Sequence, residues 1–463
     1  MLLLGYAYAH ALVRPLASRW PAFLHMALLA VALVLLLALP QPDLRSASAH
    51  PITAIFSALS LSIGLPFLLL ASTSPLLQVW MARQETGSIP WRLFALSNAG
   101  SLLALLLYPS LIEPRLTLSA QRLAWIAGFI LYALLCAAIA LRAKPAANPG
   151  PTPLPQLEMG ESAQLGGEPL AAPGTPSPFR IRLLWFLLPA AGAIQLSAVT
   201  EHITQNIAAI PLLWIIPLAA YLLTFIIAFE VPGLYRRWII VRLLTVLLAA
   251  LGWFLTQTGV TLPILLTVGF FVAEMFIACW FCHAEAYAFR PAQPSEATLF
   301  YLMIAAGGAA GAFFVGILCP LLFDANYDIA LAFFLTAAVA VLATWNSGWQ
   351  ARLLWSAATA GLLALVIMLH IANGHSLLEE RNFYGTLRVT QTNAPIALTI
   401  RTLTHGTITH GTQWFAPDFR RNPTTYYAPD SGIGVALDVC CGGRPRYIGV
   451  IGLGAGTIAA YGR

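Results

Sequence analysis

Three closely spaced glycines near the end of the sequence have the spacing of a ligand-binding turn. Residues 447–463 are YIGVIGLGAGTIAAYGR, in which Gly452, Gly454 and Gly456 follow the apolar run Tyr447–Ile451. Glycine lacks a Cβ atom, so the backbone can turn tightly and bring its N–H groups close to a nucleotide at the start of a helix. An apolar strand, a glycine turn and a helix in this order predict nucleotide binding. A glycine-rich segment that packs between helices is the alternative.

Two other patterns contain residue types that bind metals or haem. HGT occurs twice, at His405–Thr407 and His410–Thr412, beside glycines in an expected hairpin turn, which favours a structural or substrate-facing role over metal binding. CWFCH, residues 279–283, matches the C-x-x-C-H pattern of haem attachment. It ends an apolar run on the predicted cytoplasmic side, where haem is not attached covalently. A histidine at a helix interface is therefore favoured over a metal site of Cys282, His283 and Glu285, and we expect no metal centre.

Polar side chains inside apolar runs form a third group. They are Asn98, Gln195 and Glu274, with Glu201, His202 and Gln205 near a helix end. Glu274 costs most to bury, because it is ionisable and lies well inside its run. It either serves a transport pathway or is a neutral or paired interior residue, and the small number of such groups favours the second interpretation.

The composition predicts the elements that hold these residues. Only 9% of the residues are charged and 59% are hydrophobic, whereas a soluble domain carries roughly 25% charged residues. This is the composition of a multi-pass membrane protein, whose partner is the lipid bilayer. No run of Lys or Arg is typical of a nucleic-acid surface. The six cysteines lie mostly in apolar runs, and the adjacent pair Cys440 and Cys441 is a strained choice for a disulfide, so we expect no disulfide framework.

Crossing a hydrocarbon core takes about 20 apolar residues, and eleven runs reach about this length. They are 22–39, 52–81, 91–112, 121–141, 181–200, 207–229, 237–257, 261–282, 298–323, 327–345 and 350–372. Leu2–Val13 is half a span and lacks the basic start of a signal peptide. The proline-rich residues 143–178 predict a flexible linker. We therefore expect a first membrane half at 1–142, a second at 179–373, and a C-terminal unit at 374–463.

The C-terminal unit has a different pattern. After Ala372, polar and β-branched residues alternate with period two, which predicts a small unit of half-buried strands. PDSGIGVALDVCCGG then predicts a short helix, with Asp430 or Ser431 as its N-cap and Gly442 at its end. The expected fold is a mostly α, polytopic helical membrane bundle, followed by this β unit and the start of a class I, Rossmann-like α/β domain.

Several segments resemble one family in the family's own order. They are RNFYGTLRV (381–389), LTHGTITHGTQ (403–413), YYAPDSGIGVAL (426–437) and VIGLGAGTIAAYG (450–462), with NIAAIPLLWIIPLAAYLLTF (206–225), FCHAEAYAFRP (281–291) and FYLMIAAGGAAG (300–311) in the membrane part. The chain resembles the spermidine-synthase-like transferases fused to a membrane region, often named fused MFS/spermidine synthase. The resemblance implies a multi-pass protein of a bacterial-type inner (plasma) membrane and a polyamine or other amine substrate.

The resemblance also implies a set of cofactor-binding residues. These are Gly452, Gly454 and Gly456, with His405, His410, Gln413 and Tyr427 at the family's donor-binding segments. Tyr427-Ala428-Pro429 stands where the family has an imidazole or amide and a carboxylate, which puts polyamine specificity in doubt. The family's ribose-binding acid and catalytic aspartate would follow Arg463, so the catalytic residues are unknown. We expect the chain to be part of a longer protein and, as given, to hold no cofactor.

Two functions are open at this point. In an intact form, the transferase domain would bind S-adenosylmethionine or decarboxylated S-adenosylmethionine and transfer a group to an amine, with a downstream carboxylate as base. The alternative is a transporter-like or scaffold membrane protein with a vestigial nucleotide-binding domain.

The basic residues predict the topology. With Leu2–Val13 as the first helix, alternate loops form two sets, which carry twelve and three basic residues. The three are Arg45, Arg115 and Arg122. The twelve are Arg14, Arg19, Arg83, Arg92, Arg142, Lys144, Arg180, Arg182, Arg236, Arg237, Arg290 and Arg352. This bias places the first set in the cytoplasm. Twelve crossings then put the C-terminal unit outside, where S-adenosyl cofactors are not supplied. We therefore expect that one run, 298–323 or 181–200, does not cross; the alternative is that the unit is not a cytosolic enzyme.

Overall fold

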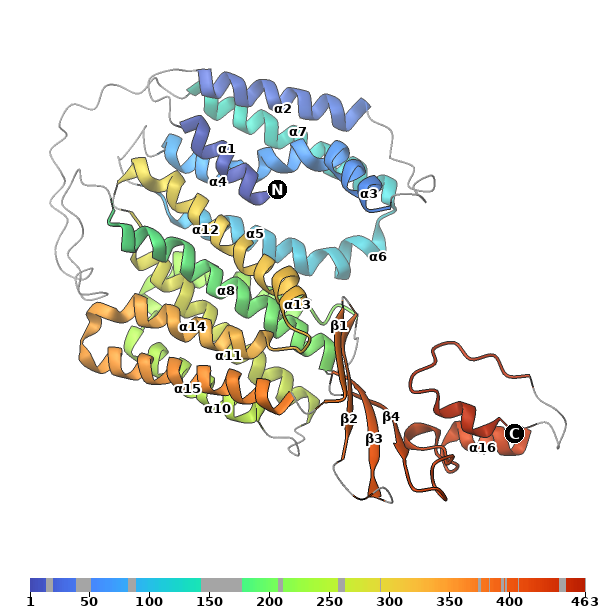
Figure 1. Ribbon diagram of the computed structural model, residues 1–463. Helices are drawn as coiled ribbons and strands as arrows, with labels where there is room; N and C mark the ends of the chain where they lie inside the picture. Colours follow the sequence, from blue (N-terminus) through green and yellow to red (C-terminus); the bar gives the residue numbers. More distant parts are fainter. Residues whose placement is uncertain are drawn as a thin grey trace.

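The computed structural model describes residues 1–13, 20–38, 51–81, 89–142, 177–206, 211–256, 263–291, 293–373, 376–382, 384–392, 395, 398–406, 408–440 and 447–462. It shows a bundle of long helices with a β-sheet and a C-terminal segment beyond one end of the bundle (Figure 1). Within these residues, ten helices are long and apolar enough to cross a membrane, and Leu2–Val13 and Ile215–Glu230 are shorter apolar helices. By length and composition, the expected multi-pass helical protein is confirmed.

The first half contains five helical segments. They are α1 (Leu2–Val13), α2 (Trp20–Ala38), α3 and α4 (Pro51–Leu59 and Leu65–Met81), α5 and α6 (Arg92–Leu107 and Glu113–Arg115), and α7 (Leu118–Arg142). The π-helical turns Ser60–Gly64 and Tyr108–Ile112 join α3 to α4 and α5 to α6. The proline-rich residues 143–176 lie outside the described residues.

The second half contains seven helical segments. They are α8 (Phe179–Asn206), α9 (Ile215–Glu230), α10 (Arg237–Leu255), α11 (Ile264–Ala288), α12 and α13 (Ala297–Phe313 and Cys319–Leu322, joined by the π-helical turn Phe314–Leu318), α14 (Asp328–Thr344) and α15 (Trp349–Asn373). Helix α8 packs against α11, α12 and α14 and so lies at the centre of this half. Its Trp185 and Leu188 are fully buried.

Glycines bring α12 close to α8. A Cβ atom at Gly307 would overlap the carbonyl oxygen of Phe186, and one at Gly311 would overlap the carbonyl oxygen of Ala190. Spaced four residues apart, these glycines form the small-residue face that lets membrane helices touch through their backbones. Gly307 and Gly311, which lie in the run 298–323, are thus packing residues. Both candidates for a run that fails to cross, 181–200 and 298–323, are long apolar helices in the bundle.

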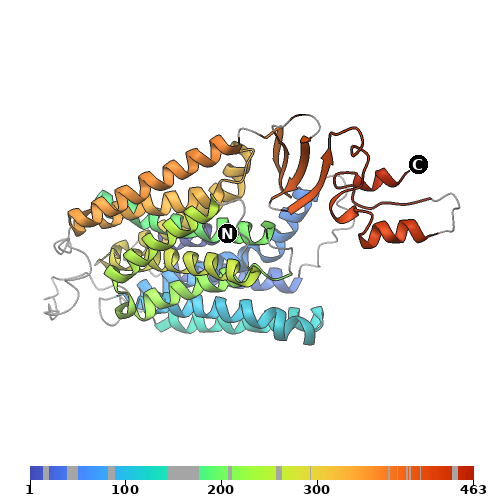
Figure 2. The same cartoon turned by 90° about the horizontal axis from the view of Figure 1, so that it is seen from below.

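Successive helices begin and end at alternate ends of the bundle. At one end, Trp185 Nε1 at the start of α8 donates to the Phe289 carbonyl after α11 (2.7 Å), and Arg180 Nη2 donates to the Leu342 carbonyl near the end of α14 (2.7 Å). We call this the basic end, because it carries the arginines at the starts of α5, α8, α10 and α15. At the other end, which we call the sheet end, α8 finishes, α14 begins and the β-sheet follows α15 (Figure 2).

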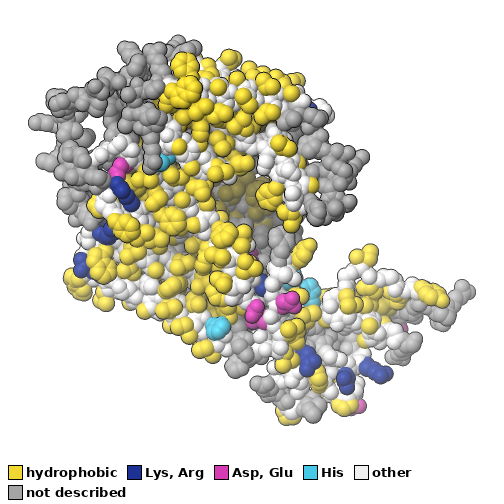
Figure 3. Space-filling view, turned by 45° about the horizontal axis from the view of Figure 1, so that its top comes forward, with side chains coloured by type: hydrophobic (Ala, Val, Ile, Leu, Met, Phe, Trp, Pro, Cys, Tyr) yellow, Lys and Arg dark blue, Asp and Glu magenta, His cyan; other side chains and the backbone are white. Residues whose placement is uncertain are grey.

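Charged side chains follow this arrangement. The face of the bundle seen in Figure 3 is covered by hydrophobic side chains, and charged groups gather toward its two ends. Large apolar residues such as Phe56, Leu123 and Val246 are 68%, 69% and 63% exposed. Such a surface needs a hydrocarbon environment, since soluble proteins rarely expose continuous apolar patches of this size.

The sheet is a four-stranded antiparallel meander in the order β1 (Leu378–Asn382), β2 (Gly385–Gln391), β3 (Ile400–His405) and β4 (Ile408–Trp414). The expected β unit is confirmed. The first HGT begins at the β3–β4 turn, as expected, but the second lies within β4. In β4, Gly411 pairs with Leu403 and Thr409 with Thr404, so His410 is left without a partner on β3. An extra residue of this kind is a β-bulge, which re-aims its side chain.

The C-terminal segment departs from the expected start of a Rossmann-like domain. Helix α16 (Gly432–Val439) is capped by Ser431, as predicted, whose hydroxyl accepts from Gly434 N (3.2 Å); the expected stop, Gly442, lies outside the described residues. Tyr447–Ile451 forms no strand, and Tyr447 and Ile451 are fully exposed. A central strand needs neighbouring strands to bond its backbone groups. The described sheet consists of β1 to β4 and does not include Tyr447–Ile451. A 3₁₀ helix, Thr457–Tyr461, follows the glycines in place of an α-helix.

Candidate functional site

The glycine turn has the backbone conformation that its sequence predicted. Gly452, Gly454 and Gly456 have φ angles of +85°, +57° and +72°, a region that favours glycine because other residues clash there. The turn packs on β4: a Cβ atom at Gly411 would lie 2.6 Å from Ala455 Cβ and 3.0 Å from Thr457 Oγ1. The absence of a side chain at Gly411 therefore lets the turn dock on the sheet.

Aromatic and imidazole rings gather beside this turn. His410 Nδ1 lies 3.3 Å from the Tyr426 hydroxyl, and the His405 and His410 ring centroids are 5.8 Å apart. The Tyr426 hydroxyl is also 3.7 Å from where a Cβ at Gly454 would be. The rings of Tyr426 and Tyr427 are 4.7 Å apart. We call these five residues the glycine-turn cluster.

Each member is held by a different part of the unit. The β-bulge aims His410, and His405 Nε2 lies 3.0 Å from the Tyr384 carbonyl in the β1–β2 turn. The Tyr427 carbonyl accepts from the Tyr461 hydroxyl (2.6 Å), which ties the 3₁₀ helix after the glycines to the segment that carries Tyr426. The cluster is therefore one folded unit, although its members come from three segments of the sequence.

The remaining predicted site residues lie apart from the cluster. Gln413 is exposed and pairs in register with Arg401 on β3. At Gly452 a Cβ atom would meet no atom within 4 Å, and at Gly456 only the side chain of Leu453. The structure thus brings together four predicted site residues (His405, His410, Tyr427 and Gly454), and adds Tyr426, which sequence reasoning quoted in a motif without giving it a role.

The chemistry available in the cluster is hydrogen bonding and stacking. Imidazole and phenol groups donate and accept, and their flat rings suit an aromatic base or an amine. The cluster contains no carboxylate to take a proton from an amine nucleophile. Its chemistry fits ligand binding.

A second polar group, which sequence reasoning missed in part, joins the sheet to the bundle. Arg381 on β1 has 1% of its side chain exposed and forms ion pairs with Asp328 (2.5 Å), also 1% exposed, and with Glu201 (2.9 Å). Burial lowers the pKa of the Arg381 guanidinium, but its bonds and charge interactions with Asp328 and Glu201 outweigh burial and raise that pKa above its ordinary value. Of the polar residues flagged near the end of α8, Glu201 is thus a partner of the sheet, whereas Gln205 bonds Glu201 and Asn326 and His202 packs on Phe271. The sequence contains no pattern that singles out Arg381 or Asp328 as an ion pair, because charged residues flank most membrane spans.

Glu274 lies inside the bundle and has no visible partner. Its side chain is fully buried, and neither carboxyl oxygen has a hydrogen-bond partner among the described residues. The expected alternative of a paired residue is therefore not observed in this part of the chain. Gln195 differs, since its Nε2 donates to Thr336 Oγ1 (2.8 Å), and Asn98 Nδ2 donates to the Phe94 carbonyl (2.9 Å).

The CWFCH segment lies in the packed core at the end of α11. His283 stacks on Phe225 with ring centroids 3.4 Å apart, and its Nδ1 lies 2.9 Å from Thr224 Oγ1. Cys279 Sγ lies 3.5 Å from the Gly192 carbonyl. Among the described residues, no group of three or more His, Cys, Asp or Glu side chains is placed to hold a metal ion. These contacts favour the predicted helix-interface histidine.

The basic end holds buried carboxylates of its own. Glu285 accepts from Tyr235 OH (2.7 Å) and Arg237 Nη2 (2.9 Å). Glu296 accepts from Arg182 Nη2 (2.5 Å) and from Ser177 Oγ (2.6 Å). Burial raises the pKa of Glu296, but the hydrogen-bond donors outweigh burial and hold this pKa below its ordinary value of 4.5.

The cysteines differ from the expectation of no disulfide framework. Among the described residues, Cys136, Cys279, Cys282 and Cys319 are free, and Cys440 is disulfide-bonded.

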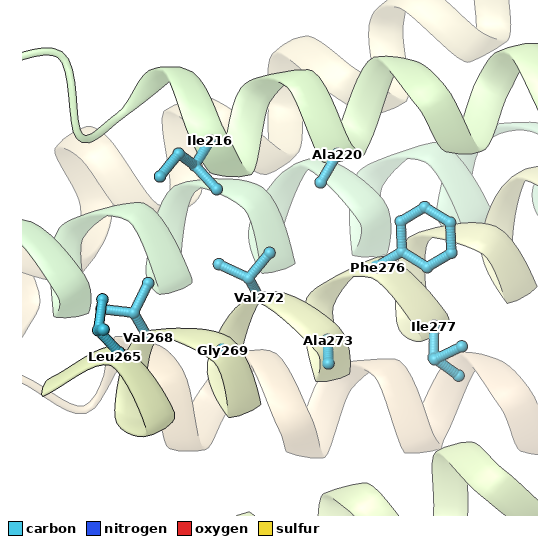
Figure 4. A pocket seen from close by; sticks show the side chains of 9 residues that line it. All are labelled: Ile216, Ala220, Leu265, Val268, Gly269, Val272, Ala273, Phe276 and Ile277. Carbon is cyan, nitrogen blue, oxygen red and sulfur yellow. The ribbon is translucent and has the colours of Figure 1, made fainter. Parts of the chain in front are cut away.

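An apolar groove of about 410 Å³ runs between α9 and α11, near the sheet end (Figure 4). It is lined only by apolar residues and glycine: Ile216, Ala220, Leu265, Val268, Gly269, Val272, Ala273, Phe276 and Ile277. Several of them are exposed, including Leu265 at 84%, so the groove opens onto the outer surface. A polar substrate would find no hydrogen-bond partner among these side chains.

Comparison with protein-family models, with curated proteins and with solved structures finds no match for this chain.

Proposed function

We propose that this chain is part of a membrane-bound spermidine-synthase-like protein, in which residues 374–463 begin a transferase-type unit attached to a multi-pass helical bundle. The observation that carries the proposal is the packing of the four C-terminal segments on which the resemblance rests. RNFYGTLRV supplies the end of β1 and most of β2, LTHGTITHGTQ supplies the end of β3 and most of β4, and the glycine turn docks on β4 beside Tyr426 of the third segment. Segments that form one unit are expected to serve one site.

In this proposal, the glycine turn and the rings beside it hold the ligand. Backbone N–H groups of the turn would face an adenosyl-type ligand, as glycine turns do in such folds. His405, His410 and Tyr426 would contact an amine or an aromatic base by hydrogen bonding and stacking. S-adenosylmethionine and its decarboxylated form are the proposed ligands, and transfer to an amine would need a carboxylate base besides the five residues of the glycine-turn cluster.

A specific observation favours a second candidate, a transporter-like or scaffold membrane protein with a vestigial binding domain. The β-sheet and the arginines of the basic end lie at opposite ends of the bundle, and both candidates for the one run expected not to cross are full-length helices. Since loops rich in Lys and Arg stay in the cytoplasm, this arrangement favours the sheet on the other side, away from the supply of S-adenosyl cofactors.

Reporter fusions separate the two candidates. An activity reporter placed after residue 160 and another placed after residue 380 report the side of the linker and of the sheet. Cytoplasmic signals from both fusions support the transferase. A cytoplasmic signal at 160 with an extracytoplasmic signal at 380 rules out a transferase that uses cytosolic cofactor and supports the second candidate.

Ligand contact gives an independent test of the glycine turn. We expect 5′-methylthioadenosine to give saturation-transfer NMR signals with the purified chain at millimolar concentration, because the glycine-turn cluster contains no carboxylate to bind ribose hydroxyls. Gly454→Val should abolish these signals, since its side chain would point at Tyr426. Gly449→Val is the matched control, because a Cβ atom there would meet nothing within 4 Å. Equal signals from both variants would refute ligand binding at the turn.

A further inference from the structure

The pocket that receives Arg381 is built by the bundle itself. Glu201 and Gln205 come from the end of α8, Asp328 is the first residue of α14, and Asn326 lies two residues before it. Gln205 Nε2 donates to Glu201 Oε1 (2.9 Å), Asn326 Nδ2 to Gln205 Oε1 (3.4 Å), and Asp328 N to Asn326 Oδ1 (3.2 Å). None of these bonds involves the sheet. We call the four residues the cation cradle.

Arg381 fills the cradle as a ligand would. Its Nη1 donates to Asp328 Oδ1 (2.9 Å) and its Nη2 to Asp328 Oδ2 (2.5 Å), which is the two-pronged geometry that a guanidinium prefers with a carboxylate. Nη2 also donates to Glu201 Oε1 (2.9 Å), and Nη1 lies 3.4 Å from the Ala325 carbonyl oxygen. The guanidinium is thus enclosed by acceptors from the bundle.

The charges in the cradle are unequal. Two carboxylates face one guanidinium, with side chains 1% exposed at Asp328 and 23% exposed at Glu201. A buried carboxylate without a counter-charge is strongly disfavoured, so Asp328 requires a cation. Arg381 arrives on β1, after the last helix, so it belongs to a different unit and could leave the cradle only with the strand that carries it.

We propose that the cation cradle is a binding site for organic cations that carry N–H donors, of the guanidinium or primary alkylammonium class, and that Arg381 is its tethered occupant. A free cation that enters the cradle displaces Arg381 and releases β1 from the end of the bundle. This inference is independent of the proposed transferase, since it concerns carboxylates of the bundle. A short tether gives Arg381 an effective concentration on the order of millimolar, so free cations compete only at millimolar levels or above.

Chemical rescue tests the cradle. Arg381→Ala should lower the thermal midpoint of the purified chain, and methylguanidinium at about 10 mM, chosen to exceed the effective concentration of the tether, should restore at least half of the loss. Tetramethylammonium at equal ionic strength should restore none, because it has no N–H donors. Arg388→Ala is the matched control, because Arg388 lies in the same sheet and pairs with Glu379 away from the cradle.

Two further variants keep the outcome decisive. If Arg381→Ala does not fold, Arg381→Gln replaces it, because glutamine keeps a side chain of intermediate length. Its thermal midpoint is then measured with methylguanidinium and with tetramethylammonium. Adding Asp328→Asn to either variant should remove the recovery, because the two-pronged acceptor is lost. Recovery that is absent, that is equal with tetramethylammonium, or that survives Asp328→Asn would overturn the proposal.

Discussion

Replacing Glu274 by methionine should stabilise the protein, although it removes a polar group from the centre of α11. Glu274 is fully buried and both of its carboxyl oxygens lack a hydrogen-bond partner among the described residues. Leaving a buried polar group unpaired costs about 1–3 kcal/mol in protein mutational data. Methionine has a similar volume and adapts to irregular space, so little of this gain should be lost to poor packing.

The size of the effect is limited by the membrane. The unfolded state in a bilayer also finds partners for polar groups, which reduces the net effect of a polar contact to about 0.6 kcal/mol on average. We therefore expect a gain of about 1 kcal/mol for Glu274→Met, near the lower bound of the soluble range. The measurement is the unfolding free energy in mixed micelles, with the thermal midpoint as a second readout.

Gln78→Met is the matched control with the opposite sign. Gln78 is also fully buried, but its Oε1 accepts from the Tyr301 hydroxyl (2.5 Å) and its Nε2 donates to Ser74 Oγ (3.0 Å). Its replacement leaves the Tyr301 hydroxyl unpaired and should cost about 1–3 kcal/mol. If Glu274→Met destabilises the protein as much as Gln78→Met does, Glu274 has a partner and the reasoning is wrong. A stabilised variant would support a functional role for Glu274, because its burial then serves no structural purpose.

Three more predictions follow from single contacts. Gly307→Ala should destabilise the α8–α12 contact by about 1–3 kcal/mol through overpacking, while Gly308→Ala, where a Cβ atom meets nothing within 4 Å, should stay within about 0.5 kcal/mol; equal effects would contradict the close approach. Gly411→Val should displace Ala455 and speed hydrogen exchange across 452–461, and unchanged exchange would show that the glycine turn does not dock on β4. The depressed pKa of Glu296 stabilises the fold above its unfolded pKa, near 4.5, and this stability is lost as the pH falls through the folded pKa. Glu296→Gln should therefore flatten the acid side of the curve of thermal midpoint against pH, and an unchanged curve would exclude this ion pair as its cause.

The helices could be predicted because the bilayer imposes a length. The run 237–257 became α10, Arg237–Leu255, and 350–372 became α15, Trp349–Asn373. A segment that crosses hydrocarbon must be apolar for about 20 residues and must satisfy its own backbone groups. The half-length run Leu2–Val13 was likewise found with its predicted bounds. The strands followed from the period-two alternation of residue types. Exposed and half-buried residues alternate along β1, whereas β2, β3 and β4 show no regular alternation of burial.

The glycines show where local pattern was ambiguous. The sequence predicted a ligand-binding role for Gly454 and gave no separate role to Gly307. In the structure, a Cβ atom at Gly454 would lie in ordinary contact with the Tyr426 hydroxyl, 3.7 Å away, whereas one at Gly307 would overlap the backbone of α8. A glycine indicates that something comes near, but the identity of the neighbour depends on elements far away in the sequence.

The sequence by itself determined that this is a multi-pass membrane protein with a small β unit after the last helix, because hydropathy and periodicity are local properties that each segment carries alone. Only the tertiary structure decided that Tyr447–Ile451 stays outside the sheet, that Glu274 has no partner within the described chain, and that Arg381 reaches Glu201 across 180 positions of sequence. Such pairings depend on how separate segments meet. No single segment records them, since a buried charge is tolerated only where a distant residue neutralises it.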